Sequence, residues 1–428
     1  MYTVSAWMLG TALYGQSSTL SLNNTNSPYS RYGVGQLNDE GFGASRAMGG
    51  IGFALRSSNQ INPLNPASYS AVDSLTFLMD AGVGLQMSRF SENGSSKTAN
   101  NSSFDYIAMQ FRLYPGLGIA AGLKPYSSVG YNLGTSGYIT DAATGDETAA
   151  TYNYFGNGGF HQVFVGLGYE PIRNLSVGFN ISYLFGSITK TATIVSDAYA
   201  DGSIRKSGTM DLYDYKLDLG VQYTYILNKE KERDLIFGAT YSLGHNFNTS
   251  STSTTGSNTQ GVTAGIKQPH ALGLGAAYRD AYWTAGIDYS LQLWDQVYNE
   301  PLSEGSGNAL SAQQPLNNRH RIAIGAEWVP NLYARNYFKQ VRYRFGAHYT
   351  TPYYKVKTAG GSWTDGPKEW GVSGGFGLPL RILRNRSLVH LSMQYVRTSL
   401  PNLVSDNTFR LCVGITFNET WFKKWRVE

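Results

Sequence analysis

The feature that most constrains this chain is a strict alternation of apolar and polar residues over long stretches. Residues 211–224 place aromatic and aliphatic side chains on one face and polar or small ones on the other. A helix would mix these two sets, whereas a β-strand separates them. Residues 174–182, 283–292 and 409–418 repeat the pattern. The sequence therefore predicts many β-strands that are apolar on one face only.

The number and spacing of these strands predict a closed architecture. Fourteen candidate strands begin near Leu75, Phe104, Leu117, Phe160, Asn174, Leu212, Leu235, His270, Tyr282, Arg319, Val341, Trp370, Leu388 and Thr408. An even count is typical of bacterial single-chain barrels. We therefore predict an all-β fold, a 14-stranded antiparallel transmembrane β-barrel over residues 75–428.

The connections between these strands alternate between long and short. The long ones are predicted at residues 91–102, 135–159, 189–208, 245–267, 297–318, 353–368 and 398–407, and they are rich in Ser, Thr, Asn and Gly. The short ones are predicted at 114–116, 170–173, 228–234, 279–281, 330–340 and 379–387. Outer-membrane barrels have short periplasmic turns and long extracellular loops, whereas a soluble sandwich has no reason to keep this order.

The composition agrees with a chain that meets lipid on one side. Charged residues make up 15% of the 428 residues and aromatics 14%, with 49 Gly and 31 Tyr. Soluble domains carry nearer a quarter charged residues, and on composition alone a large soluble β-sandwich or propeller is the alternative. No run reaches the ~18 apolar residues that a membrane helix needs. The net charge of +5 is modest and unclustered, which argues against a nucleic-acid partner.

The first 74 residues differ from the rest of the chain. Residues 1–15 are similar to the apolar core and small-residue end of a secretory signal, although no Lys or Arg precedes Arg31. We expect a leader over 1–15, cleaved near Gly15, with an ordinary first strand as the alternative. Residues 16–74 lack alternation. This segment is either a periplasmic tail or a hatch (plug) inside the lumen, where irregular backbone finds polar partners. Lumen-facing positions are often Gly, Ala or Ser, which leaves room for a hatch, so we assign 16–74 to one.

Two short motifs in this segment suggest a family. Ala47-Met48-Gly49-Gly50 precedes Asn65-Pro66-Ala67. The pair resembles the hatch of the FadL/TodX family of outer-membrane transporters, in which a hatch with an Asn-Pro-Ala triplet precedes a fourteen-stranded barrel. The opening at 27–33 and the tail at 417–422 resemble the version found in Bacteroidota. The resemblance implies a protein of the outer membrane of a Gram-negative bacterium. The family's ligand-contacting residues do not align one by one, so substrate identity does not carry over.

The third predicted strand contains a proline. It runs from Leu117 through Lys124, Pro125 and Tyr126. A proline inside a barrel strand removes one ladder hydrogen bond, so a gap or kink is expected there. The FadL family has a kinked third strand that opens a lateral window to the membrane, and the resemblance implies that these three residues form such a gate. The alternative is that the strand ends at Lys124 and a loop begins.

The sequence shows no enzyme chemistry. Its six His residues do not pair at metal-ligand spacing, Cys412 is the only cysteine, and the glycines at 49–52 lack the strand–helix context of a phosphate loop. We expect no catalytic residues, no metal and no cofactor. Seven charged residues are predicted to face the lumen: Asp214, Lys216, Asp218, Asp288, Arg319, Arg321 and Glu327. They form either a functional network or pairs with one another and with the hatch.

Three functions remain open. The first is passive uptake of hydrophobic, fatty-acid-like small molecules through the hatch and a lateral opening. The second is a non-transporting barrel subunit of an outer-membrane protein assembly or secretion complex, a role for which FadL-like barrels in Bacteroidota are recruited. The third is a simple polar porin. The partners expected are outer-membrane lipids, a hydrophobic small molecule and, for the second function, other complex subunits.

Overall fold

A computed structural model of the chain describes residues 25–38, 41–92, 94–140, 145–197, 202–262, 266–297, 315–357, 362–380, 387–401 and 403–420. The predicted leader at 1–15 and its cleavage point lie outside the described residues, as does the end of the tail from Trp421.

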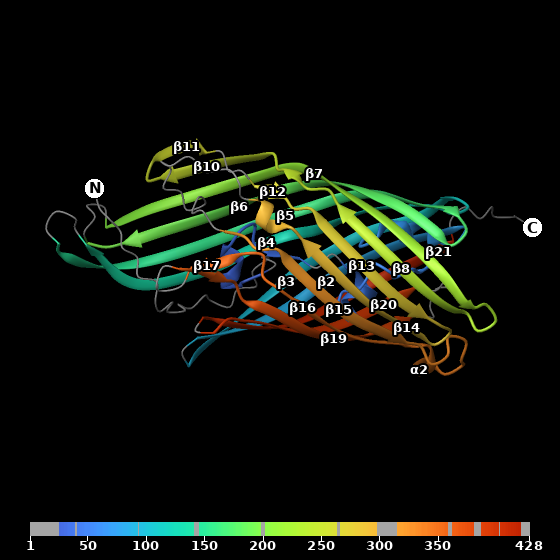
Figure 1. Cartoon of the computed structure of the whole chain (residues 1–428). Coiled ribbons are helices and arrows are strands. Elements are labelled where there is room, and N and C mark those ends of the chain that lie inside the picture. The colour runs from blue at the N-terminus through green and yellow to red at the C-terminus, as the bar shows by residue number, and fades with distance from the viewer. Residues whose placement is uncertain are drawn as a thin grey trace, which may run out of the picture.

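Fourteen long strands of the described residues form one closed antiparallel barrel (Figure 1). They are β2 (Thr76–Glu92), β3 (Ser95–Tyr114), β4 (Leu117–Thr140), β5 (Glu147–Ile172), β6 (Leu175–Val195), β7 (Ser203–Asn228), β8 (Arg233–Ser242), β13 (Ala271–Arg279), β14 (Trp283–Gln292), β15 (Arg319–Trp328), β16 (Arg342–Thr350), β19 (Lys368–Pro379), β20 (Leu388–Ser399) and β21 (Ser405–Thr420). Each pairs with the next, and β21 pairs with β2 from Thr76↔Thr420 to Ser91↔Ser405, which closes the barrel. The predicted fold and strand count are confirmed.

Shorter elements decorate this barrel. The strands are β1 (Gln36–Leu37), β9 (His245–Asn246), β10 (Thr249–Thr255), β11 (Asn258–Val262), β12 (Lys267–Gln268), β17 (Lys355–Lys357) and β18 (Trp363–Asp365). The helices are η1 (Pro28–Arg31), α1 (Gly43–Ala47), η2 (Pro66–Ala71), η3 (Trp294–Val297) and α2 (Tyr337–Gln340). None of the described helices is long and apolar enough to cross a membrane.

The alternation sets which side chains face outward. On β7, the side chains of Leu219 and Val221 are 45% and 43% exposed. The side chain of Gln222, which lies between the barrel wall and the hatch, is buried. Exposed Val, Leu, Ile, Met and aromatic side chains recur on the outer face of the other strands. An outer face of this kind meets hydrocarbon in a transmembrane barrel. The register predicted for β7 from its sequence is therefore the one found.

Three of the predicted long loops are largely extensions of barrel strands, and a fourth, 245–267, contains the hairpin of β10 and β11, in which β10 pairs with β7. Residues 91–102 were expected as a loop, but β3 begins at Ser95 and pairs Ser95 with Glu92 across a tight turn. Residues 135–159 and 189–208 are largely strand, because β4 to β7 pair with one another well beyond the apolar belt. Ser, Thr, Asn and Gly predict loops by propensity, whereas pairing with a neighbouring strand supplies the hydrogen bonds that hold these polar segments extended. At this end, the barrel is therefore extended by long strands and not by long loops.

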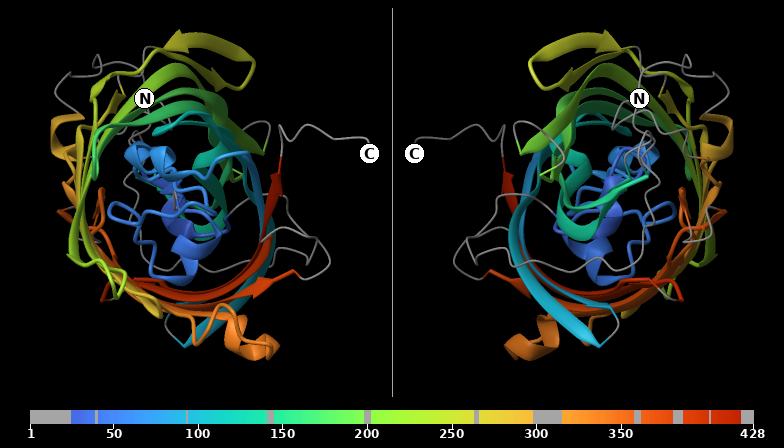
Figure 2. Two further views of the ribbon diagram at one scale, coloured as in Figure 1. Left: turned by 90° about the vertical axis from the view of Figure 1, so that its right-hand side faces the viewer. Right: turned by 90° about the vertical axis from the view of Figure 1, so that its left-hand side faces the viewer.

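The segment before β2 lies inside the barrel. Figure 2 shows the blue N-terminal segment within the ring of strands in both end views. Its helix η2 contacts β4, β5, β6 and β7, and α1 contacts β16, β19, β20 and β21. The described part of the segment is therefore a hatch and not a periplasmic tail.

Candidate functional site

The hatch backbone is seated against a ring of glycines near the short-turn ends of the strands. A Cβ added at Gly238 would lie 1.9 Å from the carbonyl oxygen of Phe53. One added at Gly346 would lie 2.2 Å from the amide nitrogen of Gly49. The other members that meet hatch atoms include Gly118, Gly168, Gly178, Gly220 and Gly325. Only glycine lets two backbones approach this closely, so these positions fix where the hatch sits.

The predicted glycine motif makes a turn that faces β15, β16 and β19. Gly49 and Gly50 have φ of +69° and +80°, in the left-handed region that glycine tolerates. The Gly49 amide donates to Ser373 Oγ at 2.8 Å, and its carbonyl oxygen accepts from Arg321 Nη2 at 3.1 Å. The motif therefore attaches the hatch to the wall through its own backbone.

The Asn-Pro-Ala triplet attaches the hatch on the opposite side. Asn65 Nδ2 donates to the carbonyl oxygens of Phe53 at 2.7 Å and Val221 at 3.1 Å. Its Oδ1 accepts from the Ala67 amide at 3.1 Å, which caps η2, and Pro66 takes the first helical position that suits a proline. The contacts of these three residues are structural, between hatch segments and strand β7.

The seven predicted lumen charges do not form one network. Asp288 accepts from the amides of Gly52 at 2.6 Å and Phe53 at 2.9 Å, and Arg321 donates to Gly49 as described. Glu327 instead pairs with Arg342 and Arg344, both at 2.7 Å. The remaining four divide between two other places. Lys216 and Asp218, which pair at 3.1 Å, line a small cavity together with Arg319, whereas Asp214 accepts from the Asn248 amide at 2.7 Å.

One buried ion pair of the hatch was missed by sequence reasoning. Arg46 Nη1 on α1 lies 2.7 Å from Asp105 Oδ2 on β3, and both side chains are almost fully buried. Asp105 is the extra residue of a β-bulge, because Gly82 pairs with Tyr106 and Val83 with Phe104. A bulge turns two consecutive residues to one side, so Asp105 and Tyr106 both face the lumen. The signal was present in the sequence, where the outward-facing Phe104 and Ile107 stand three residues apart.

A chain of hydrogen bonds runs from Tyr106 around the inner wall. The Tyr106 hydroxyl accepts from the Gly43 amide at 2.9 Å and donates to Asp80 Oδ1 at 3.1 Å. Thr416 bonds Asp80 at 3.0 Å and His390 at 2.8 Å. His390 in turn contacts Arg344 at 2.7 Å, and Arg344 holds Glu327. The wall from β15 round to β3 is thereby linked to α1.

The hatch also has a charged contact at the short-turn end. Arg56 Nη2 lies 2.9 Å from Glu170 Oε2, and its Nη1 donates to Ser70 Oγ at 2.9 Å. Burial lowers the pKa of Arg56, and the adjacent Glu170 acts in the opposite direction. A cavity of about 420 Å³ lies beside this pair, lined among others by Arg112 and Arg279.

The barrel wall opens between β3 and β4. Their pairing runs from Tyr114↔Leu117 to Ile107↔Leu123 and then stops. Beyond that point β4 turns into the lumen, where Ser127 and Ser128 pair with Leu37 and Gln36 of β1. Among the residues that the structure describes, β2 is the only strand that pairs with residues 95–106 of β3. β3 and β4 are therefore paired near the short-turn end of the barrel and separated toward the long-loop end.

The predicted gate residues lie at this turn. Pro125 comes two residues after the last pair with β3, and Tyr126 is an extra residue between the pairs Pro125↔His161 and Ser127↔Phe160. The strand continues to Thr140, so it does not end at Lys124. Lys124 is buried with its Nζ 5.8 Å from the Phe164 ring centroid, and the Tyr126 hydroxyl donates to Gln268 at 3.1 Å.

Glycines carry the same bend into the neighbouring strands. Gly158 on β5 and Gly186 on β6 have φ of +112° and +141°. A Cβ on Gly158 would lie 2.1 Å from the carbonyl oxygen of Ser187. The glycine-rich stretch that was expected to end a loop is therefore a bend within a paired strand.

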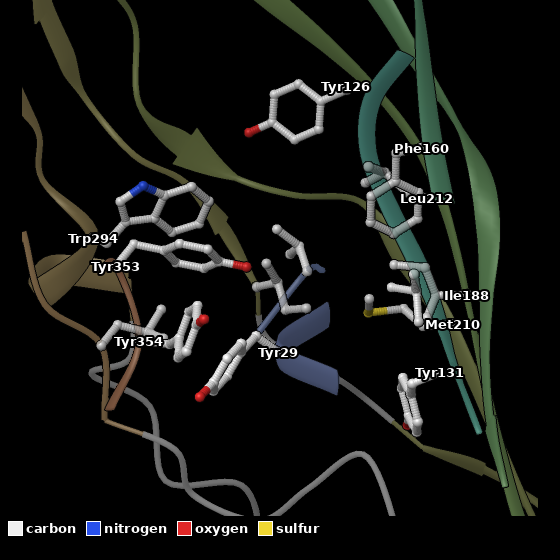
Figure 3. Close-up of a cluster of buried hydrophobic side chains, with 14 of the residues drawn as sticks. Tyr29, Tyr126, Tyr131, Phe160, Ile188, Met210, Leu212, Trp294, Tyr353 and Tyr354 are labelled. Carbon is white, nitrogen blue, oxygen red and sulfur yellow. The ribbon is translucent and has the colours of Figure 1, made fainter. Parts of the chain in front are cut away.

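Apolar side chains fill the long-loop half of the lumen. Figure 3 shows this aromatic cluster, in which Tyr29 of the hatch lies with Trp294, Tyr353 and Tyr354 from the loop side, and residues of β4 to β7 lie across from them. The wall members are Tyr126, Tyr131, Phe160, Ile188, Met210 and Leu212. Hydroxyls at its edge bond backbone, as Tyr29 does to Val404 and Tyr353 to Gly35. Cavities of about 60 and 110 Å³ remain beside the hatch.

No metal-binding chemistry is found in the described ranges, since no group of three or more His, Cys, Asp or Glu side chains there could hold a metal ion.

Comparison with solved structures shows the fold of the FadL and TodX proteins. The toluene transporter TbuX of Ralstonia pickettii has a TM-score of 0.57 and 17% identity, covering 89% of this chain and 98% of that one. A FadL homologue of Pseudomonas aeruginosa has a TM-score of 0.59 and 10% identity, covering 90% and 99%. The toluene transporter TodX of Pseudomonas putida has a TM-score of 0.53 and 14% identity, covering 90% and 100%. At these identities the likeness is one of fold.

The family follows from the sequence itself. No curated protein matches the chain. The model of the BamG family, however, matches residues 4–428, which is nearly the whole length. With a hatch, a closed fourteen-stranded barrel and this match, the protein belongs to the BamG family.

Proposed function

We propose that this protein is a channel of the outer membrane of a Gram-negative bacterium that takes up hydrophobic, fatty-acid-like small molecules. The observation that carries the proposal is the separation of β3 from β4 after Ile107↔Leu123. A hydrophobic molecule that entered from the long-loop side would leave sideways through this separation, and would not cross the hatch.

The chemistry of the lumen supports such a route. The long-loop half holds the aromatic cluster, whose side chains favour an apolar molecule over water. The short-turn half is closed by the hatch, whose backbone fits the glycine ring. An apolar path that ends at a polar barrier directs a molecule to the wall. The cavities of about 60 and 110 Å³ hold only a few atoms, so passage requires the aromatic side chains to move.

Lys124, Pro125 and Tyr126 are the proposed gate. Pro125 has no N–H to offer a neighbouring strand. Tyr126 adds a residue to β4, and its carbonyl oxygen accepts from the Asn38 amide of the hatch at 3.0 Å. Both features favour the inward course of β4. Gly49, Gly50 and the Asn-Pro-Ala triplet act in this proposal as the fixed points that keep the hatch closed.

The test is uptake of a radiolabelled long-chain fatty acid by liposomes that carry the purified barrel. We expect Pro125→Val to lower uptake several-fold, because valine restores a donor and favours regular pairing. The matched control is Pro401→Val, an exposed loop proline, which leaves uptake unchanged. Deleting residues 45–70 is expected to raise leak of small polar solutes. Wild-type uptake equal to that of empty liposomes would overturn the proposal.

A second candidate is a non-transporting subunit of an outer-membrane assembly or secretion complex. The match to the BamG family model favours it, since the family name hints at such a role. The many contacts that fasten the hatch also suit a barrel that stays shut. Native purification in mild detergent, followed by mass spectrometry for proteins and lipids, separates the two candidates. A stoichiometric protein partner with no retained lipid favours the subunit, and a retained fatty-acid-like molecule with no partner favours the channel.

A further inference from the structure

The separation of β3 from β4 leaves an unpaired strand edge in the barrel wall. Residues 98–106 of β3 pair with β2 on one side, and no described strand pairs with their other side. Along a strand, alternate backbone N–H and C=O groups point to opposite edges, so half of those in this segment point away from β2. An open edge of this kind is a template for another strand.

Part of this edge lies at the depth of the membrane. The β2 residues opposite it, Val83, Leu85 and Met87, are 56%, 55% and 52% exposed and all apolar. Met87 pairs with Phe409 on its other side, whose ring is also exposed. These outward side chains belong to the lipid-facing surface, and irregular or open backbone does not occur where lipid would cover it. If the barrel is a closed subunit and not a channel with a water-lined window, a cover that forms hydrogen bonds satisfies this edge.

The outward side chains of β3 point to the same conclusion. Leu85 pairs with Ser102, and Met87 pairs with Asn100. On the outer face, the two β3 positions that pair with these apolar β2 residues are therefore polar. Hydrocarbon cannot satisfy a hydroxyl or an amide, whereas a neighbouring polypeptide can. Ser102 and Asn100 are also small enough for another backbone to come close.

The chain's own β4 is not free to provide the cover. Its pairs with β1 at Ser127 and Ser128 hold it inside the lumen. Further contacts add to this, as Ser30 Oγ bonds Gly130 at 3.1 Å and Asn38 Nδ2 donates to Ser128 Oγ at 2.9 Å. Returning β4 to β3 would break all of these contacts and unbend Gly158 and Gly186.

We propose that residues 100–106 of β3 bind an extended strand of a partner outer-membrane polypeptide by β-strand addition. An added strand forms hydrogen bonds with the exposed backbone N–H and C=O groups of β3, whereas a lipid tail cannot. This mode of binding gives affinity through main-chain hydrogen bonds. The partner strand presents polar or small side chains beside Ser102 and Asn100. This inference deepens the second candidate function and rests on it, because it names the contact through which the barrel joins a complex.

The experiment uses the full-length protein in its own membrane. A photo-crosslinking amino acid, p-benzoylphenylalanine, replaces Asn100 or Ser102, one at a time. The control site is Ile181 on β6, which is 54% exposed and paired on both sides by β5 and β7. We expect one discrete protein adduct at each β3 site, at least tenfold above the control. Moving the crosslinker by two residues is expected to shift the captured partner position by two, which only a paired strand produces.

A second variant tests the edge without relying on capture alone. Ser102→Lys places a charge on the edge and is expected to reduce the Asn100 adduct at least fivefold, because an edge lysine opposes strand addition. Thr98→Lys, beyond the proposed segment, is expected to retain the adduct. Heat-modifiable migration on a gel confirms that both variants fold.

Four outcomes would overturn the inference: adducts no stronger than at Ile181, adducts to lipid alone, adducts to a second copy of this chain, or adducts to residues 1–24 of the same chain. If a complex co-purifies intact while β3 gives no adduct, the strand addition is wrong and the subunit function stands. If no protein partner is found by either method, both are wrong.

Discussion

The two halves of the lumen are filled by different kinds of interaction. In the short-turn half, the hatch is held by directional contacts, such as Asp288 with two amides and Arg46 with Asp105. In the long-loop half, the aromatic cluster packs through apolar surface. Directional contacts are satisfied in one geometry only, whereas apolar packing is not directional. The hatch is therefore positioned firmly, and the half beside the wall opening has more freedom to rearrange.

The largest effect on stability is expected at Arg46, in the half of the lumen that is held by directional contacts. Replacing it with alanine leaves Asp105 buried without its partner, and removing one member of a buried pair costs ~3–5 kcal/mol. We expect Arg46→Ala to lower the stability of the seated hatch by about that amount, measured by hydrogen exchange of α1 in detergent micelles. The comparison is Arg279→Ala, which removes a partly exposed pair with Asp234 and one hydrogen bond from Nη1 to the hatch carbonyl oxygen of Arg56, at 3.1 Å. An exposed pair contributes at most ~1 kcal/mol and a single hydrogen bond about 1 kcal/mol, so a smaller effect than that of Arg46→Ala is expected. Equal effects at the two sites would show that the hatch is not held by this pair.

The two faces of β7 provide the next test. Leu219→Arg puts a charge in the lipid-facing surface, at a cost of ~2–4 kcal/mol near the bilayer centre. The alternation of residues 211–224 places Gln222 on the lumen face, where a polar substitution is ordinarily tolerated. The structure corrects this, because Gln222 donates to the carbonyl oxygens of Phe53 at 3.0 Å and Leu55 at 3.1 Å.

The two variants are therefore separated by what they disturb. Leu219→Arg is expected to lower the urea midpoint of the barrel in lipid vesicles, with no added leak. Gln222→Arg is expected to displace the hatch and raise solute leak. Leak from Leu219→Arg, or a lowered urea midpoint without leak from Gln222→Arg, would contradict the assigned faces.

The glycine ring is tested by adding a side chain. Gly238→Val forces the wall and Phe53 apart, and overpacking of this kind typically costs ~1–3 kcal/mol. We expect faster swelling of liposomes in a small polar sugar, with the barrel still heat-modifiable. Gly261→Val is the control, because a Cβ at Gly261 meets nothing within 4 Å. Swelling unchanged from wild type would mean that the glycine ring does not seat the hatch.

The smallest effect is expected in the aromatic half. Tyr353→Phe removes the hydroxyl that bonds the Gly35 carbonyl oxygen, a loss of about 1 kcal/mol. The ring stays in the cluster, so the urea midpoint should shift slightly and uptake should not fall. A shift as large as that of Arg46→Ala would remove the distinction between the two halves.

Much of the barrel could be predicted because alternation is a local property. The apolar face of residues 211–224 identifies a strand and its outward side without reference to any other segment. The strand count follows from the same periodicity. Strand ends were predicted less well, since residues 95–102 and 147–159 read as loops by composition and are held extended by their neighbours.

The sequence by itself determined the strands, their faces and the presence of a glycine-rich and proline-containing segment ahead of them. The tertiary structure alone decided where that segment sits, that the bulge at Asp105 meets Arg46, and that β3 and β4 separate after Ile107↔Leu123. Alternation is a relation between residues two positions apart in the chain, so a short segment of sequence is enough to show it. The hatch contacts join residues far apart in the chain, as Gly52 is joined to Asp288. Such pairs are selected by the shape of the closed barrel, which no local pattern encodes.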